Sequence, residues 1–278
     1  MCVEIKMEKF SLPVLSVQNL SAQSQAGWRA VSDISFDVGM GECIAIIGPN
    51  GSGKSSLLKA ITRQFSIIAG KVELSGIDIC QLSRQEMAQW ISIVAQHEYV
   101  DPRLTVGEYV WLGRTPHACY FSQQEHENVV NQSLTDVGLY HKKEHHFGDL
   151  SGGEQQRANI ARAFAQKARI ILLDEPTNHL DPLARIELLN LVKAKGVTAV
   201  AVLHDLSLVS EFADKVLLLQ NQKMVAYSCP EGVLNDQFIS PTFGLRVIPF
   251  QHPRANSIIH HFEALSSNRY DQPRGGVV

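Results

Sequence analysis

The sequence predicts an α/β protein with a central parallel β-sheet, an antiparallel sheet at its edge and an inserted helical subdomain. Three observations support this prediction. Continuous apolar runs of strand length recur along the chain, which is typical of strands buried on both faces of a parallel sheet. In the second half these runs alternate with helical patterns. Between about residues 97 and 150, strand signals are few and several helix starts occur.

The N-terminal part predicts antiparallel strands followed by a buried strand. Residues 14–20 and 34–38 alternate apolar and polar side chains, whereas residues 43–48 form a continuous apolar run. A glycine loop follows, and residues 54–62 have helical periodicity. Further strands are predicted at 71–74, 91–95, 169–174, 198–204 and 215–220, and helices at 182–195 and 205–213.

The stretch of about 97–150 reads as the helical insertion. Thr105 with Glu108, and Ser122 with Glu125, both fit the capping box that starts a helix, and Gly138 is a suitable stop for the second helix. From about residue 241 the chain contains Pro and His and is weakly patterned. We expect a domain over 12–238 and a short C-terminal extension over 239–278, whose role the sequence leaves open.

Composition and charge exclude several classes of protein. The 278 residues carry a formal net charge of −3 and no basic stripe, so no nucleic-acid partner is expected. The five cysteines show no CxxC pair, which argues against a disulfide framework or zinc site and suits a reducing cytoplasm. The N-terminus does not resemble a secretory signal, and the longest apolar runs are only of strand length. We therefore expect a soluble protein.

A phosphate-binding loop follows the buried strand at 43–48. Its sequence GPNGSGKSS fits GxxxxGK[ST] between a strand and a helix, the context that this motif requires and that defines a P-loop NTPase core. Its backbone N–H groups would face the phosphates of ATP, Lys54 would reach the β- and γ-phosphates, and Ser55 would bind Mg²⁺. The predicted loop residues are Gly48, Pro49, Asn50, Gly51, Ser52, Gly53, Lys54, Ser55 and Ser56.

Polar side chains end three further predicted strands. Asp174 and Glu175 follow an apolar strand, where Asp174 would hold Mg²⁺ and Glu175 would direct the attacking water. His204 ends the next strand and could donate to the γ-phosphate, although a lone histidine is more often structural. Gln96 ends the strand at 91–95 in the same manner, and it would be an ordinary polar strand end if taken alone.

A second site for phosphate is predicted at residues 150–157, LSGGEQQR. Ser151 and Glu154 fit a capping box, and Gly152 and Gly153 would leave free N–H groups at the helix start, which can bind an anion. Because the first loop already has its own nucleotide, the simplest solution is a symmetric dimer. Each chain's Ser151–Glu154 segment would then close over ATP held by the partner's Lys54 loop.

These motifs, in this order, resemble the ATPase subunits of ABC transporters over about residues 12–238. GPNGSGKSS resembles the Walker A loop, LSGGEQQR the signature and ILLDEP the Walker B strand with its catalytic glutamate. Gln96 resembles the Q-loop glutamine, which in that family contacts Mg²⁺ and water. Residues 178–181 resemble the D-loop, and His204 resembles the switch histidine. The resemblance implies that the helical subdomain receives a coupling helix from a membrane permease, which would place the chain at the cytoplasmic face of the inner membrane.

Two positions depart from the commonest family pattern. Position 154 is Glu where the signature usually has Gln, and little loss is expected because Glu completes the capping box. The aromatic residue that often stacks on adenine corresponds to Gln25 here, while Trp28 lies nearby but out of register. The sequence therefore leaves the adenine-stacking residue open.

The segment at 101–117 resembles the ATPases of importers for ferric siderophores, haem and cobalamin, which work with permease subunits and a periplasmic binding protein. Ferric siderophore is the favoured cargo, with haem or cobalamin as alternatives, but no residue decides between them. Two alternative functions from other classes are a soluble ABC ATPase and a P-loop enzyme that acts alone. The pairs His145–His146 and His260–His261 are expected at a solvated surface rather than on a metal, and Cys229 is expected to be inert.

Overall fold

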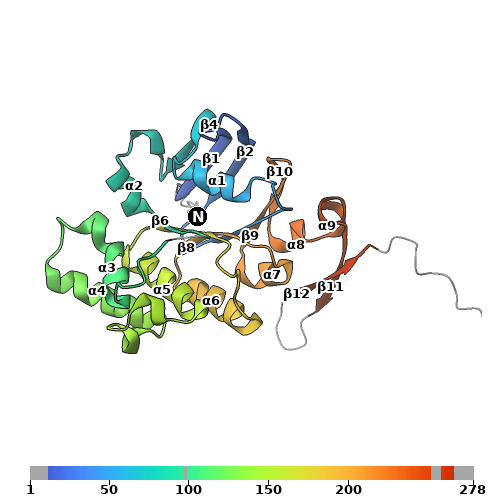
Figure 1. Ribbon diagram of the computed structural model, residues 1–278. Coiled ribbons are helices and arrows are strands. Elements are labelled where there is room, and N and C mark those ends of the chain that lie inside the picture. The colour runs from blue at the N-terminus through green and yellow to red at the C-terminus, as the bar shows by residue number, and fades with distance from the viewer. Residues whose placement is uncertain (1–11, 97–98, 252–257, 266–278) are drawn as a thin grey trace, which may run out of the picture.

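The main sheet is mostly parallel and has the strand order β10-β9-β3-β8-β7-β6 (Figure 1). The computed structural model describes residues 12–96, 99–251 and 258–265. Strands β3, β6, β7, β8 and β9 run parallel, while β10 pairs antiparallel with β9 at one edge. Its strands are β3 (Cys43–Ile47), β6 (Ile91–Val94), β7 (Ile170–Asp174), β8 (Thr198–Val202), β9 (Lys215–Gln220) and β10 (Lys223–Ser228).

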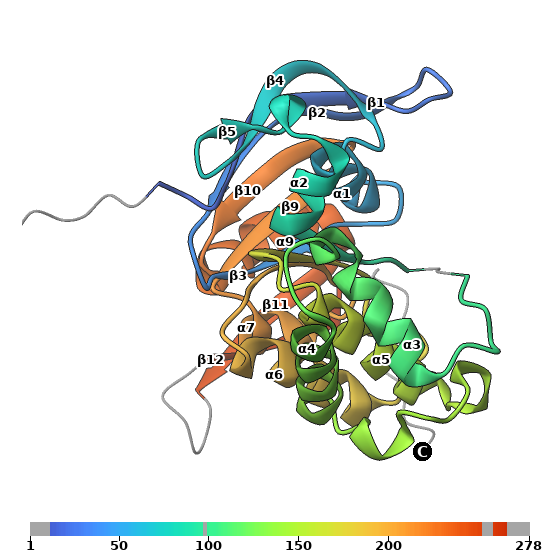
Figure 2. The same cartoon turned by 90° about the vertical axis from the view of Figure 1, so that its left-hand side faces the viewer.

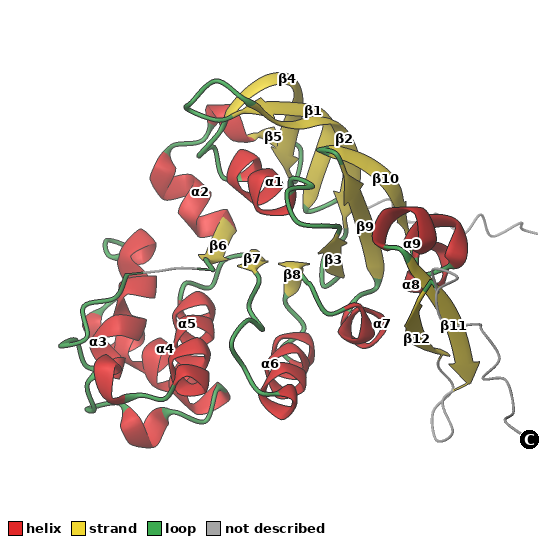
Figure 3. Cartoon of the chain, turned by 45° about the vertical axis from the view of Figure 1, so that its right-hand side comes forward, coloured by secondary structure: helices red, strands yellow, loops and turns green. Residues whose placement is uncertain are grey.

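A second, antiparallel sheet has the order β2-β1-β4-β5, as the alternating N-terminal pattern predicts. Its strands are β1 (Leu15–Gln23), β2 (Arg29–Val38), β4 (Ser66–Leu74) and β5 (Ile77–Asp78). Helix α1 (Lys54–Ile61) lies between this sheet and the main sheet (Figure 3). The strand predicted at 71–74 is the end of the longer β4.

The main sheet separates two hydrophobic cores, because successive side chains of a strand point to opposite faces. Ile44 and Ile46 of β3 pack with α1 and the antiparallel sheet, whereas Ala45 and Ile47 pack with the helices of the other face. These helices are α5 (Gly152–Ala165), α6 (Pro182–Ala194) and the short α7 (Val209–Phe212), which follows the 3₁₀ turn η5 (Leu206–Leu208). The α/β fold class is thus confirmed, with both faces of the sheet covered.

The helical region lies to one side of the sheet (Figure 2). It contains α3 (Val106–Trp111), the 3₁₀ helix η2 (Leu112–His117), α4 (Gln123–Asp136) and the turns η3 (Tyr140–Lys142) and η4 (Phe147–Asp149). Each capping box predicted at Thr105, Ser122 and Ser151 is formed. Gly138 follows the end of α4 with a φ of 72°, a left-handed conformation that glycine adopts readily.

The short η1 (Ile79–Gln81) and α2 (Arg84–Trp90) lie between the two sheets and the helical region. The sequence analysis predicted neither of them. A capping box of Ser83 and Glu86 begins α2. No helix of residues 12–96, 99–251 and 258–265 combines the length and apolarity that a bilayer crossing needs.

The C-terminal extension contains regular structure despite its weak pattern. Helices α8 (Pro230–Val233) and α9 (Asp236–Phe243) lead into an antiparallel hairpin of β11 (Leu245–Gln251) and β12 (Ile258–Ala264). Helix α9 spans the expected domain boundary at 238. Phe243, Leu245 and Phe262 pack against the core on the α5–α7 face of the main sheet. The hairpin is therefore attached to the domain.

Candidate nucleotide site

The predicted phosphate loop joins β3 to α1, and its lysine is buried. The Lys54 side-chain amine donates to the carbonyl oxygens of Gly48 and Pro49 at 2.8 and 3.0 Å. Burial lowers the pKa of Lys54, because the charged amine loses water. The nearby carboxylates of Glu175 and Asp174 oppose this shift. A buried cation whose hydrogen bonds go to backbone carbonyls is well placed to exchange them for bonds to a phosphate.

Two glycines of the loop occupy positions that other residues would not fit. Gly48 has a φ of 153°, and a Cβ atom there would lie 2.2 Å from the carbonyl oxygen of Leu219. Gly53 has a φ of 101°, with the carbonyl oxygen of Ala30 3.0 Å from such an atom. These close approaches fold the loop into a cradle whose N–H groups precede α1.

The predicted magnesium ligands lie together. The Ser55 hydroxyl donates to Oδ1 of Asp174 at 2.8 Å, which joins the first turn of α1 to the end of β7. Burial raises the pKa of Asp174, and its hydrogen bond from Ser55 opposes that shift. A hydroxyl and a desolvated carboxylate are hard oxygen donors, the chemistry that Mg²⁺ prefers. These two residues therefore fit the ion beside a phosphate.

Glu175 is the centre of a hydrogen-bond cluster at the end of the sheet. Its Oε2 accepts from Nε2 of Gln96 at 2.5 Å and also from the Asn178 side-chain amide. Its Oε1 lies 2.5 Å from Nε2 of His204. These partners meet because β6, β7 and β8 are adjacent and parallel, so that their carboxyl ends share one edge.

The backbone of Glu175 is unusual. Its φ is 54°, a left-handed conformation that costs most residues other than glycine, Asn and Asp about 1–2 kcal/mol. The turn is closed by the Asn178 N–H, which donates to the Glu175 carbonyl at 3.2 Å. Such strain is typical of functional sites, where the surrounding contacts hold it in place.

One cavity of about 690 Å³ joins the phosphate loop to this cluster. Asn178 and Gln222 also line it. The sequence places Asn178 only within the stretch that resembles the D-loop, and it gives Gln222 no role. The first could have been found from its place three residues after Glu175, while nothing in the sequence points to Gln222. The cavity is lined by Trp28, Ala30, Asn50, Gly51, Gly53, Lys54, Ser55, Ser56, Gln96, Glu175, Asn178, His204 and Gln222.

Trp28, rather than Gln25, lines the nucleotide cavity. The Trp28 side chain is half exposed, and its ring meets Phe65 edge to face at a centroid distance of 5.8 Å. Gln25 lines a different cavity. Of the two residues that the sequence left open, Trp28 is therefore the one that can offer a flat face to an adenine.

The second predicted phosphate site lies outside the first cavity. None of Ser151, Gly152, Gly153 and Glu154 lines the cavity of Lys54. Glu154 instead completes the helix cap with Ser151 and accepts a hydrogen bond of 2.5 Å from Lys142. The bond from Lys142 and the helix cap lower the pKa of Glu154 to about 2. Within one chain this segment therefore does not reach the Lys54 cavity, although Gly152 lines a neighbouring cavity with Gln96 and Glu175.

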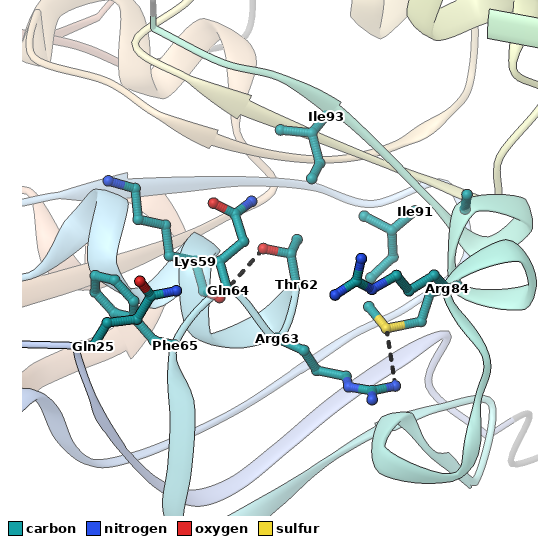
Figure 4. Close-up of a pocket in the computed structure, with 11 residues that line it drawn as sticks. Gln25, Lys59, Thr62, Arg63, Gln64, Phe65, Arg84, Ile91 and Ile93 are labelled. Carbon is teal, nitrogen blue, oxygen red and sulfur yellow. Dashed lines mark hydrogen bonds between the residues drawn. The ribbon is translucent and has the colours of Figure 1, made fainter.

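A basic groove of about 650 Å³ opens between α1 and α2 (Figure 4). Lys59, Arg63 and Arg84 line it, over a floor that includes Ile91 and Ile93, and no acidic side chain is among its lining residues. Arg63 is anchored by the carbonyl oxygens of Ile79 and Leu82. The groove therefore offers positive charge beside an apolar surface.

The histidine pairs do not form a metal site. No cluster of three or more metal-binding side chains occurs in the part of the chain that the structure describes. His145, His146 and His261 are exposed, as expected. The expectation was wrong for His260, which is only 6% exposed, because the predicted solvated tail is a hairpin that packs on the domain.

The fold and site together define a P-loop ATPase with a separate signature helix. Comparison with known proteins agrees, since the family described as ABC transporter matches residues 31–178. The ferric enterobactin transport ATP-binding protein FepC of Escherichia coli (strain K12) is 35% identical over 236 residues, 83% of this chain and 87% of FepC. The hemin import ATP-binding protein HmuV of Pseudomonas entomophila (strain L48) is 35% identical over 233 residues, 81% of this chain and 91% of HmuV.

Solved structures lead to the same family. A transporter described as of the metal-chelate type, in an inward-facing conformation, aligns with a TM-score of 0.77 and 30% identity over 92% of this chain and 98% of that one. The cbiO1 protein of Clostridium perfringens aligns with a TM-score of 0.71 and 26% identity over 80% and 90%. The chain belongs to the ABC transporter ATP-binding proteins, and it is an ATPase of that family.

Proposed function

We propose that this chain hydrolyses ATP to power the import of a metal chelate through a membrane permease, with a ferric siderophore as the favoured cargo and haem or cobalamin as alternatives. The cluster of Gln96, Asn178 and His204 around Glu175 carries the hydrolytic part of the proposal. Similarity to the ferric enterobactin transport protein FepC, to the hemin import protein HmuV and to the metal-chelate type transporter supports the cargo class.

ATP hydrolysis would give a role to the charged and polar side chains that surround the phosphate position. Lys54 holds the β- and γ-phosphates, and Glu175 orients the attacking water and takes up its proton. His204 donates to the γ-phosphate and Gln96 positions the water, so both their bonds to Glu175 are exchanged for bonds to the substrate. Mg²⁺, held by Asp174 and Ser55 with Gln96 nearby, would neutralise the charge that develops on the phosphate oxygens.

The separation of the two phosphate sites supports a head-to-tail dimer. Because Gly152 and Gly153 do not line their own chain's Lys54 cavity, they would close over the nucleotide of a second copy. ATP-dependent dimerisation tests this arrangement. Glu175→Gln should bind ATP and accumulate as a dimer with Mg²⁺, measured by light scattering. If that variant stays monomeric at saturating ATP, the second phosphate site has another role.

We place the working chain at the cytoplasmic face of the inner membrane, with permease subunits and, indirectly, a periplasmic binding protein. The basic groove supports a contact with a permease segment that carries a carboxylate, because Lys59, Arg63 and Arg84 have no acidic neighbour among the lining residues. Arg84→Glu should then abolish transport while the purified chain still hydrolyses ATP. Equal loss of both activities would remove the groove from the proposal.

Growth of a deletion strain under iron limitation tests the cargo. Cells supplied with ferric siderophores should fail to grow without the gene, and wild type but not Glu175→Gln should restore growth. Normal growth on ferric siderophores, with no redundant importer present, would direct the search to haem or cobalamin. Normal growth on ferric siderophores and on haem, with normal uptake of cobalamin and with ATPase activity in the purified chain, would favour a soluble ABC ATPase that is not coupled to transport.

A further inference from the structure

The C-terminal hairpin lies against the segment that follows His204. Strand β12 contacts η5 and α7, which are the next elements along the chain after His204. A cavity of about 420 Å³ lies between the hairpin and this segment. It is lined by His204, Asp205, Leu206, Ser207, Phe243, Leu245, His260, His261 and Phe262. The extension therefore reaches the same loop that presents His204 to Glu175.

His260 makes the polar contact between the two parts. Its side chain is buried, and its Nδ1 lies 2.8 Å from the Ser210 hydroxyl of α7. The next residue, His261, points to the opposite side of the strand and is exposed. A buried imidazole that is bonded to a serine fixes the spacing between β12 and α7, because leaving that polar pair unmatched would carry a desolvation cost.

Apolar side chains such as Val209 and Phe212 anchor the segment from 205 to 212 in the core, while polar contacts with α6 and β12 hold its outer side. From α6, Arg185 pairs with Asp205 at 3.6 Å and Lys193 donates to the carbonyl of Glu211 at 2.6 Å. From β12 comes the bond of His260 to Ser210. Releasing the contact at Ser210 would let the outer side of the segment relax around this anchor, and we expect a small displacement of His204, which directly precedes the segment.

We propose that His260 is a positioning residue for ATP hydrolysis. Through Ser210 it holds the segment 205–212 in the place where His204 reaches Glu175, so the C-terminal hairpin sets the rate of the chemical step. The inference rests on the proposed roles of Glu175 and His204. It gives the extension a function within its own chain, independent of a dimer or permease contact.

Steady-state ATPase kinetics of the full chain test the inference. His260→Leu and Ser210→Ala should each lower kcat roughly fivefold, the loss expected for one misplaced contact, and leave the KM for ATP within about twofold. The KM should be preserved because neither residue lines the Lys54 cavity. The double variant should be no worse than either single variant, since both substitutions remove the same bond.

A conservative variant separates positioning from folding. His260→Asn keeps a hydrogen-bonding atom at the δ position and should restore most of kcat, whereas Ile259→Ala, on the exposed face of the same strand, should change nothing. Melting temperatures show whether a variant is folded. Full kcat in Ser210→Ala, or equal losses in His260→Asn and His260→Leu when both are folded, would overturn the inference.

His204→Ala, measured in the same assay, distinguishes this failure from a failure of the proposed function. If His204→Ala keeps wild-type turnover, the role assigned to His204 is wrong and the positioning argument falls with it. If His204→Ala is slow while His260→Leu and Ser210→Ala are both normal, the hydrolytic proposal stands and the positioning role of His260 alone is rejected.

Discussion

The Nε2 atom of His204 lies 2.5 Å from Oε1 of Glu175, although 28 residues of chain separate the two positions. The contact follows from sheet register, because Asp174 of β7 pairs with Val202 of β8 and both side chains emerge just beyond that pair. Neither residue needs a long loop to reach the other. The carboxyl ends of β7 and β8 therefore bring the two side chains together.

Glu175→Gln should retain ATP binding and lose hydrolysis by at least about a hundredfold, because the amide cannot accept the proton of the attacking water. The substitution keeps the size of the side chain and one hydrogen-bond acceptor for Gln96 or Asn178. Phosphate release measures turnover, and nucleotide fluorescence measures binding. Glu144→Gln, which changes an exposed acid of the helical region, serves as the control. Near-normal turnover in Glu175→Gln would refute the role of the carboxylate.

Gly48→Ala should abolish nucleotide binding, because the new Cβ atom would meet the Leu219 carbonyl at 2.2 Å and push the loop out of shape. Gly196→Ala is a matched control, since Gly196 also has a positive φ, of 65°, but nothing lies within 4 Å of its Cβ position. The control should lose about 1 kcal/mol of stability and keep its affinity for ATP. Calorimetric titration with ATP measures the affinity of both variants. Normal binding by Gly48→Ala would show that the close approach at Gly48 is not needed to bind the nucleotide.

Trp28→Ala should raise the KM for ATP about tenfold with little change in kcat, because base stacking on an aromatic ring contributes roughly 1–3 kcal/mol. Trp28→Phe should keep most of the affinity, and Gln25→Ala should leave it unchanged, since Gln25 lines another cavity. Quenching of Trp28 fluorescence by ATP, seen by comparing wild type with Trp28→Phe, gives an independent reading. An unchanged KM in Trp28→Ala would exclude the ring as the adenine platform.

Glu154 should make stability depend on acid pH. Its folded pKa of about 2 lies below the ordinary value of 4.5, so its contribution is complete above about pH 4.5 and is lost as the pH falls toward 2. Glu154→Gln can still cap the helix but lacks the negative charge that pairs with Lys142. The difference in the free energy of unfolding between wild type and this variant should therefore become smaller from pH 7 to pH 3.5. Urea unfolding at both pH values measures it. A constant gap would show that the carboxylate contributes nothing by its charge.

The part of the candidate site that could be predicted from the sequence consists of side chains at the ends of strands. Gln96, Asp174, Glu175 and His204 each follow an apolar run, and adjacent parallel strands bring such positions to one edge. Asn178 lies only three residues after Glu175, but its contact with that carboxylate depends on a turn with a left-handed residue, which the sequence pattern does not show. The place of Trp28 depends likewise on the path of the turn between β1 and β2.

The C-terminal hairpin could not be predicted by the same reasoning. Pro249 lies inside β11, where proline normally argues against a strand, and β12 begins with two adjacent apolar residues rather than an alternation. The pairing of β11 with β12 is local, but the contacts that bury the hairpin are with η5 and α7, about 50 residues earlier in the chain. Burial of His260 therefore depends on tertiary packing, which the adjacent His260 and His261 in a weakly patterned tail do not reveal.

The left-handed backbone of Glu175 means that stability and activity make opposite demands on this position. A glycine there would relieve about 1–2 kcal/mol of backbone strain, yet it would leave no carboxylate in the cavity. A thermostabilisation campaign guided by turn preferences alone would thus remove the carboxylate to which we assign the attacking water. For this ATPase, an engineer should treat a strained residue beside a phosphate loop as protected, and seek stability in other turns.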